Sequence, residues 1–343
     1  MFLTRRYQRM LAAVMSLVMT AMPVTAMAAG TAPEEDLTYD VQFAILTMEE
    51  SALQESLFGE DTVLPEEPEL DSQKLTNITD PNAVTLVYNG FPLELDNYAR
   101  LYNGVTCVPV RDYFEAMGCT VSWDVAQNKI FITREDGLQM ELQPGSRVAK
   151  ANGRCWYMAA ACAYSAGVTM IPLRDAAKVF NGEVIWEKET KTAYITGGGL
   201  LESGDTYYNQ EDLLWIARIV RHESCNQPLD GKVAVANVII NRMNHPGFPS
   251  TAEEVIYDTR NGVQFVKRSS KSILKDPCQT CWLAAKLALE GYETAPDCLY
   301  FASNKVAPRC WAGRNRQVAL VIGGHTFFYK NTQKGLLRLM SLN

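Results

Sequence analysis

Histidine is scarce in this sequence, which limits the metal chemistry that it can support. Only three histidines occur in 343 residues, at His222, His245 and His325. The H-E-x-x-H spacing of zinc peptidases is absent. A zinc site built on His222, Glu223 and a distant histidine is therefore disfavoured, and we expect neither a metal nor a cofactor.

Long hydrophobic runs are also lacking beyond the N-terminus. Arg5, Arg6 and Arg9 precede the apolar segment MLAAVMSLVMTAM, and AMA at 26–28 offers small residues for cleavage. These features predict a signal peptide over residues 1–28. An uncleaved membrane anchor is the alternative, but the run is short for a membrane span. We therefore expect an exported protein.

Basic residues are almost missing from residues 31–80. This segment holds fourteen Asp and Glu against the single Lys74, so residues 29–80 are expected to form an acidic flexible linker. The remaining residues, 81–343, carry a net charge of +3. Such a weak basic excess suits an anionic polymer such as cell wall better than it suits nucleic acid, which we do not expect as a partner.

Cysteine, in contrast, is plentiful, and the number of cysteines is odd. Nine cysteines in an exported chain favour disulfides over zinc, with at least one thiol unpaired within the chain and a pairing that the sequence does not reveal. The CQTC motif at 278–281 opens a helical pattern without the βαβ context of thioredoxin-like sites. A redox role for this motif, and a zinc site of Cys278, Cys281, Cys298 and Cys310, are the less favoured alternatives.

The middle of the chain contains an internal repeat. Residues 108–133 align without a gap with residues 171–196, and seven positions are identical, including the Arg111/Arg174, Asp112/Asp175 and Trp123/Trp186 pairs. Each unit is typical of a proline-led turn, a short helix from the Arg-Asp pair and a two-stranded hairpin. Residues 84–95 and 138–153 supply further strands. The pattern predicts one α+β domain made of two related halves.

The repeated pattern VPVRDYFEAMG…VSWD…IFIT resembles the stalk-like domain at the N-terminus of copper amine oxidases. The resemblance implies a stalk-like domain over residues 81–198 with no copper site, followed by a linker over 199–206. The stretch from 84 to 197 contains no histidine. We interpret the Arg-Asp pairs as structural, with wall or surface contacts through this domain as the alternative role.

A carboxylate ends the first helical pattern of the last third. Asn209 is a capping signal for a helix that starts near Gln210, and the helix is expected to stop near SCNQP. The apolar stripe of this helix, continued by three or four residues, reaches Glu223. Burial and the negative end of the helix dipole should both raise the pKa of this carboxyl. A general acid and a buried structural Glu paired with an arginine are both consistent with the pattern.

The next helix, over residues 231–244 with Asp230 as its cap, is almost wholly apolar and so expected to be buried. Asn237 and Asn241 fall on one face of it. Buried amides need partners, which either a substrate or neighbouring backbone supplies.

These segments carry a second resemblance. LLWIARIVRHESCNQPLDGKVAVANVIINRMNHPGFPSTAEEVIY…QF, followed by AAKLALEG, LYF and GGHTFF, resembles the spore cortex-lytic type of cell wall hydrolase. The resemblance implies a mainly helical, lytic-transglycosylase-like catalytic domain over residues 207–332, a C-terminal tail over 333–343, and peptidoglycan glycan strands as the substrate. It implies Glu223 as the catalytic residue. It also implies a cleft lined or supported by Asn241, Arg242, Gln264, Phe265, Tyr300, Phe301 and His325.

The sequence departs from this family at Gln227, where many members have a second Glu. Neither Asp230, a helix cap, nor the solvated Glu253, Glu254 and Asp258 shows the inward pattern of Glu223. One acid/base suits lytic transglycosylation, which gives a 1,6-anhydro product. We expect an enzyme of the wall or spore cortex, with a role in germination. The alternatives are a wall-binding protein with an inactive domain and a cysteine peptidase using His222 and Cys225.

Overall fold

A computed structural model describes residues 80–165 and 167–329 of the chain. The predicted signal peptide, nearly all of the acidic linker and the C-terminal tail lie outside these residues. Within the described part, none of the helices is long and apolar enough to cross a bilayer.

Both segments of the internal repeat form the expected helix and hairpin. In each, a strand ending in proline leads directly into the helix, with Pro109 or Pro172 as the N-cap. The first segment contains β4 (Val105–Pro109), α5 (Val110–Ala116), β5 (Thr120–Asp124) and β6 (Lys129–Thr133). The second contains β11 (Val168–Pro172), α6 (Leu173–Lys178), β12 (Glu183–Glu187) and β13 (Thr192–Thr196).

The two hairpins join different sheets, so the halves are not placed alike. Strands β4 and β11 pair antiparallel, and β12–β13 extends their sheet beyond β1. The other strands of this eight-stranded sheet are β1 (Ala83–Tyr88), β2 (Phe91–Pro92), β3 (Ala99–Tyr102) and β10 (Ala163–Ser165). The β5–β6 hairpin instead begins a five-stranded sheet with β7 (Gln139–Leu142), β8 (Val148–Ala151) and β9 (Arg154–Tyr157).

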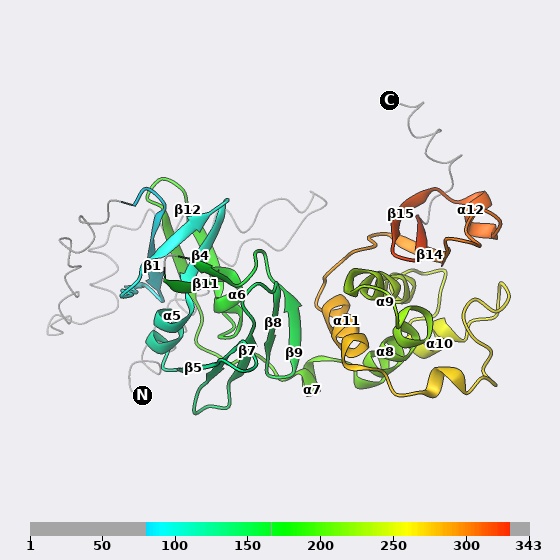
Figure 1. The fold of residues 1–343 in the computed structure, drawn as a ribbon, viewed down its shortest axis with the longest axis horizontal. Coiled ribbons are helices and arrows are strands. Elements are labelled where there is room, and N and C mark those ends of the chain that lie inside the picture. The colour runs from blue at the N-terminus through cyan, green and yellow to red at the C-terminus, as the bar shows by residue number, and fades with distance from the viewer. Residues whose placement is uncertain (1–79, 166, 330–343) are drawn as a thin grey trace, which may run out of the picture. The chain divides into compact units, whose positions relative to one another are not determined.

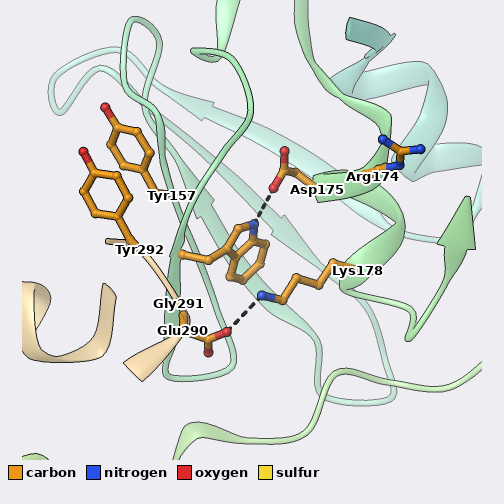
Figure 2. A pocket seen from close by; sticks show the side chains of 8 residues that line it. Tyr157, Arg174, Asp175, Lys178, Glu290, Gly291 and Tyr292 are labelled. Atoms are coloured by element: carbon orange, nitrogen blue, oxygen red, sulfur yellow. Dashed lines mark hydrogen bonds and ion pairs between the residues drawn. The ribbon is translucent and has the colours of Figure 1, made fainter. Parts of the chain in front are cut away.

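The repeated aspartates hold loops in place. The Asp112 carboxylate accepts hydrogen bonds from the backbone N and side-chain Nδ2 of Asn97. Asp175, labelled in Figure 2, accepts one from the indole Nε1 of Trp156, at 2.9 Å. It accepts another from the backbone N of Ala159. These contacts agree with a structural interpretation of the pair.

The rest of the described chain forms helices and one small sheet (Figure 1). The helical elements are α7 (Gly204–Tyr207), α8 (Gln210–Ser224), α9 (Leu229–Met243), α10 (Ala252–Ile256), the 3-10 turn η1 (Ser272–Leu274), α11 (Gln279–Leu289) and α12 (Trp311–Asn315). The sheet has the order β14 (Cys298–Ser303), β16 (His325–Tyr329), β15 (Val318–Ile322). Helix α9 packs against α8, α11 and β14, and its residues from Val233 to Ile239 are all buried.

Helix α9 begins two residues earlier than expected, at Leu229, and Pro228 rather than Asp230 is its N-cap. A proline suits this place because the first turn needs no backbone N–H partner. Asp230 instead accepts a hydrogen bond from the Tyr292 hydroxyl. Backbone groups, and not a ligand, form the hydrogen bonds of the Asn237 side chain. Its Nδ2 donates to the carbonyl of Tyr292, and its Oδ1 accepts from the backbone N–H groups of Thr294 and Ala295.

Two large hydrophobic cores, and a small one of Ala307, Ala312 and Phe328, underlie these elements. One is built from buried residues between Val84 and Leu201, and the other mainly from residues between Tyr208 and Phe327. Where α11 ends, the Glu290 side chain is only 2% exposed and binds Arg154 and Lys178 at 2.6 and 2.9 Å. Figure 2 shows Lys178 and Glu290 beside a pocket that Tyr157 and Tyr292 also line.

Candidate active site

Glu223 lies in the last turn of α8 and lines a cavity of about 840 Å³. The Asn209 side chain caps the other end of this helix by accepting from the backbone N of Glu211 and Asp212. Leu213, Ile216, Ala217 and Val220 bury one stripe of the helix, as the apolar spacing predicts. The continuation of this stripe carries the carboxylate toward the cavity.

Burial dominates the electrostatics of this carboxylate. The side chain of Glu223 is 25% exposed, and desolvation raises its pKa to about 7. The nearest candidate partner is His222, whose Nε2 lies 3.7 Å from Oε1 of Glu223. Burial and the neighbouring Arg221 lower the pKa of His222, so the imidazole is neutral near pH 7. Glu223 is therefore poised to be protonated in a large fraction of molecules at neutral pH.

Six of the seven residues expected to line or support the cleft, Arg242 among them, line the same cavity as Glu223. Tyr300 and Phe301 come from β14, His325 from the start of β16, and Gln264 and Phe265 from the segment after α10. Sequence segments up to 102 residues from Glu223 therefore meet at one site.

Asn241 is the exception, because it is not part of the described cavity lining. Its Nδ2 donates to the carbonyl oxygens of Ala295 and Cys298, at 3.3 and 3.0 Å. The side chain thus ties α9 to the chain entering β14, the strand that carries Tyr300 and Phe301. The structure places Asn241 as a support of the cavity wall and not as a contact to its contents.

His325 and the aromatic rings form the inner wall. The His325 ring lies edge-on to Phe301, with centroids 5.4 Å apart, and the residue is 8% exposed. Burial lowers the pKa of His325, so this imidazole too is uncharged at neutral pH. Phe265 and Phe301 pack against each other at 6.0 Å. This part of the wall therefore consists of aromatic rings and a neutral imidazole, and it places no charge in the cavity at neutral pH.

Arg242 brings a buried positive charge to the cavity. The residue is 3% exposed, and its Nε donates to the carbonyl of Leu299 at 2.8 Å. The guanidinium lies 4.8 Å from the ring centroid of Phe265 and 4.9 Å from that of Phe248, where the ring faces attract a cation. Burial lowers the pKa of Arg242 to about 10, so it stays charged at neutral pH.

Asp258 corrects an expectation, because it is not fully solvated. Its side chain is 6% exposed and lines the cavity. The carboxylate accepts from the backbone N, Nε and Nη2 of Arg260, at 3.0, 2.9 and 2.8 Å. The Arg260 guanidinium lowers the pKa of Asp258, so this carboxylate is ionised in the pH range where Glu223 still binds a proton in a large fraction of molecules. The cavity thus contains two carboxyl groups whose pKa values are shifted in opposite directions.

Sequence reasoning missed an aromatic and basic part of the wall. Trp311 is 52% exposed, and its ring lies 5.4 Å from that of Tyr300. The Arg316 guanidinium lies 4.9 Å from the Trp311 ring. The signal that would have singled out this segment is a tryptophan beside basic residues, in CWAGRNR. The place of Trp311 in the cavity wall, however, depends on how the chain from β14 to β16 folds.

Gln227, the departure from the family pattern, does not line the described cavity. Its Oε1 accepts from the backbone N of Gly324 at 2.7 Å, in the turn that leads into His325. Glutamine supplies the same oxygen acceptor as glutamate at this place. The substitution is therefore compatible with an intact hairpin and an intact cavity.

Comparisons with known proteins agree with this division of the chain. Residues 226–328 match the family model described as Cell Wall Hydrolase, and residues 87–195 match that of the copper amine oxidase N-terminal domain. All of the cavity residues named above except Glu223 lie inside the first match. Glu223 precedes its first residue, Asn226, by three positions, so its assignment rests on the geometry of the cavity.

Several relatives are spore cortex-lytic enzymes. That of Bacillus cereus is 32% identical over 120 residues, which cover 35% of this chain and 45% of the relative. That of Oceanobacillus iheyensis is 31% identical over 152 residues, covering 41% and 54%. The chain thus spans about half the length of these curated relatives. The solved catalytic domain of the germination-specific lytic transglycosylase SleB from Bacillus anthracis is 31% identical, with 36% of this chain and 98% of that chain covered and a TM-score of 0.32.

Proposed function

From the cell wall hydrolase match over residues 226–328, we propose that this protein is an exported enzyme that cleaves peptidoglycan glycan strands after N-acetylmuramic acid. The observation that carries the proposal is Glu223, a carboxylic acid with a pKa of about 7 that faces a cavity with aromatic walls. A general acid that operates near neutral pH needs this combination.

In the proposed mechanism Glu223 acts twice. The protonated carboxyl first donates its proton to the glycosidic oxygen, and the bond from this oxygen to the anomeric carbon of N-acetylmuramic acid breaks. The resulting carboxylate then takes the proton from the 6-hydroxyl of the same sugar, whose oxygen bonds to the anomeric carbon. The product carries a 1,6-anhydro ring, no water is consumed, and Glu223 regains its proton. This is lytic transglycosylation with one acid/base.

The cavity wall supports a sugar substrate. The rings of Tyr300, Phe301 and Trp311 supply flat apolar surfaces, and the Gln264 amide and Arg242 guanidinium supply polar groups. Ligand sites of this kind combine many apolar contacts with a few polar groups that fix orientation. Because the relatives are spore cortex-lytic enzymes, we further propose spore cortex as the wall that is degraded, during germination.

Asp258 supports a second candidate, hydrolysis. An ionised carboxylate in the same cavity as a protonated one is the pair that glycoside hydrolases use. Asp258 would then activate a water, and the product would have a reducing end. The three hydrogen bonds from Arg260 to Asp258 favour the first mechanism, because they lower the pKa of Asp258 and so make it a weaker base.

The test compares the products of wild type, Glu223→Gln and Asp258→Asn on purified cortex peptidoglycan, measured by mass spectrometry. We expect 1,6-anhydro ends from wild type, a loss of at least about 100-fold in Glu223→Gln, and the same ends at a reduced rate in Asp258→Asn. Glu211→Gln, an exposed change in the first turn of α8, is the matched control and should equal wild type.

Three outcomes would overturn parts of the proposal. Reducing ends from wild type, with activity abolished in Asp258→Asn, would establish hydrolysis instead. Equal activity of Glu223→Gln and wild type would remove Glu223 from the chemistry. Wall binding without cleavage by wild type would support the alternative of a wall-binding protein with an inactive domain.

The domain boundaries and the N-terminal domain complete the proposal. We propose the stalk-like domain at 81–198 and the catalytic domain at 207–332, which the two hydrophobic cores and the two family matches support. Export depends on the proposed signal peptide at 1–28. The stalk-like domain would hold the catalytic domain at the wall or surface.

A further inference from the structure

Three cysteines from distant parts of the chain meet outside the described cavity lining. Cys225 is the C-cap of α8, Cys278 is the N-cap of α11 and Cys281 lies in the first turn of α11. Their Sγ atoms all lie within 4.8 Å of one another, and those of Cys278 and Cys281 are 3.3 Å apart. No disulfide joins any of the described cysteines, so these three are thiols held side by side.

The three thiols differ in accessibility and acidity. Cys225 and Cys278 are exposed, whereas Cys281 is buried. The Thr280 hydroxyl, the Cys281 thiol and backbone N–H groups at the start of α11 lower the pKa of Cys278 to about 6. Burial raises the pKa of Cys281 to about 12. Cys278 is therefore a solvent-facing thiolate at neutral pH, and the protonated thiol of the buried Cys281 lies 3.3 Å from it.

We propose that Cys225, Cys278 and Cys281 form a thiol–disulfide exchange site in which Cys278 holds a disulfide bond to either of the other two. The co-reactant is a small-molecule or protein disulfide. The Cys278 thiolate attacks one sulfur of that disulfide, which forms a mixed disulfide and releases the other sulfur as a thiolate. Cys281 or Cys225 then loses a proton, attacks Cys278 Sγ and releases the second thiolate. Two cysteine thiols are oxidised, and one external disulfide is reduced to two thiols.

The choice between the two partners has different structural consequences. A Cys278–Cys281 bond stays within one turn of α11. A Cys225–Cys278 bond ties the C-terminal end of α8 to the N-terminal end of α11, across 53 residues of chain. Exchange between them needs no further oxidant, because the free Cys225 thiolate displaces Cys281 from Cys278. Cys225 follows Glu223 by two positions, so the second bond restrains the helix end that carries the proposed acid.

Ligand number argues against a structural zinc ion at this place. Structural zinc sites have four ligands in a tetrahedron. The cluster offers three cysteines, and the described chain places neither Cys298 nor Cys310 with them. Cys298 is buried at the start of β14, and Cys310 caps α12. The four-cysteine zinc site considered from the sequence is therefore not assembled.

The test uses the full chain, reduced and then exposed to glutathione disulfide, with free thiols alkylated and peptides mapped by mass spectrometry. We expect one disulfide within the cluster, always containing Cys278, and the third thiol alkylated. Cys281→Ser should trap the Cys225–Cys278 bond, and Cys225→Ser the Cys278–Cys281 bond. Cys278→Ser should slow disulfide formation in the cluster at least about tenfold at pH 7. Cys310→Ser, outside the cluster, is the matched control and should exchange at the wild-type rate.

Three results would overturn the proposal. The first is that all three thiols stay alkylatable after exposure to glutathione disulfide. The second is that Cys278→Ser forms a Cys225–Cys281 bond at the wild-type exchange rate. The third is one zinc ion per chain that protects all three thiols and is released by a thiol-blocking mercurial. None of these measurements involves glycan cleavage, so failure of the exchange proposal can be distinguished from failure of the proposed function.

Discussion

At the scale of single residues, the buried position of Glu223 favours proton donation by its carboxyl and lowers the stability of the fold. The side chain is three-quarters covered, and no ion pair at neutral pH compensates for the burial because His222 is uncharged. Desolvation therefore holds a proton on the carboxyl up to about pH 7. A buried acid without a partner weakens the fold once it ionises, but it supplies a proton donor in the range where most carboxyls have none.

The first prediction concerns activity against pH. Because the proton donor is the protonated form of Glu223, kcat/KM should fall about tenfold per pH unit above its pKa of about 7. The other groups facing the site do not produce this limb. Above pH 7 Arg242 remains charged, Asp258 remains ionised and His325, whose pKa burial lowers, remains neutral as the pH rises to 9. Initial rates on solubilised glycan strands measure the profile, and a rate that rises through pH 7 would contradict an acid in the first step.

The second prediction concerns stability against pH. The folded-state pKa of Glu223 is raised from 4.5 to about 7, so between these values the folded chain holds a proton that the unfolded chain has lost. The free energy of unfolding should therefore fall as pH rises through this window, by at most about 3 kcal/mol. Glu223→Gln removes this contribution and should be more stable than wild type at pH 8, as measured by urea unfolding. Glu211→Gln is the control, and equal pH slopes for Glu223→Gln and wild type would show that the carboxyl is solvated.

At the scale of elements, the sequence predicted the helix ends and hairpins that depend on residues close together in the chain. The Asn209 cap, the stop at Cys225 and the stripe that ends at Glu223 depend on residues within one helix, and these expectations match α8. The two hairpins of the repeat were also predicted, because alternating strands joined by short turns are local. The start of α9 was misplaced because Asp230 resembles a cap in sequence, while its carboxylate is used by Tyr292, which is 62 residues away.

Helix α9 gives the third prediction. Asn237 is 3% exposed, and its amide satisfies one carbonyl and two N–H groups of the segment 292–295. Asn237→Ala would leave these buried groups without partners, so the free energy of unfolding should fall by about 2–4 kcal/mol. Urea unfolding measures the loss. Asn244→Ala, an exposed change at the C-cap of the same helix, should stay within about 0.5 kcal/mol of wild type, and a similarly small effect of Asn237→Ala would mean that water replaces its bonds.

At the scale of the whole molecule, the cavity is made by segments that no local pattern connects. Glu223 comes from α8, Arg242 from α9, Asp258 and Phe265 from the chain after α10, and Tyr300 from β14. The resemblance to a known family predicted several of these positions. It did not predict Asp258, because the TAEEVIYD segment looks solvated in sequence and the cavity wall that Asp258 joins is assembled from distant segments. Trp311 was missed for the same reason, since a short helix between β14 and β15 brings it to the cavity.

Trp311 gives the last prediction, because it is the exposed ring of a wall assembled from distant segments. It is 52% exposed, and Tyr300 and Arg316 hold it from one side, which leaves a free face for a sugar ring to pack against. A contact that is equally good before and during the reaction affects binding alone. Trp311→Ala should therefore raise KM about tenfold for solubilised glycan strands and leave kcat within about twofold, a loss typical of one aromatic contact. Leu274→Ala, which is also exposed, at 47%, but lies in η1 outside the cavity lining, is the control and should change neither constant. A fall in kcat with unchanged KM would place Trp311 against the reacting sugar in the transition state rather than at a binding position along the strand.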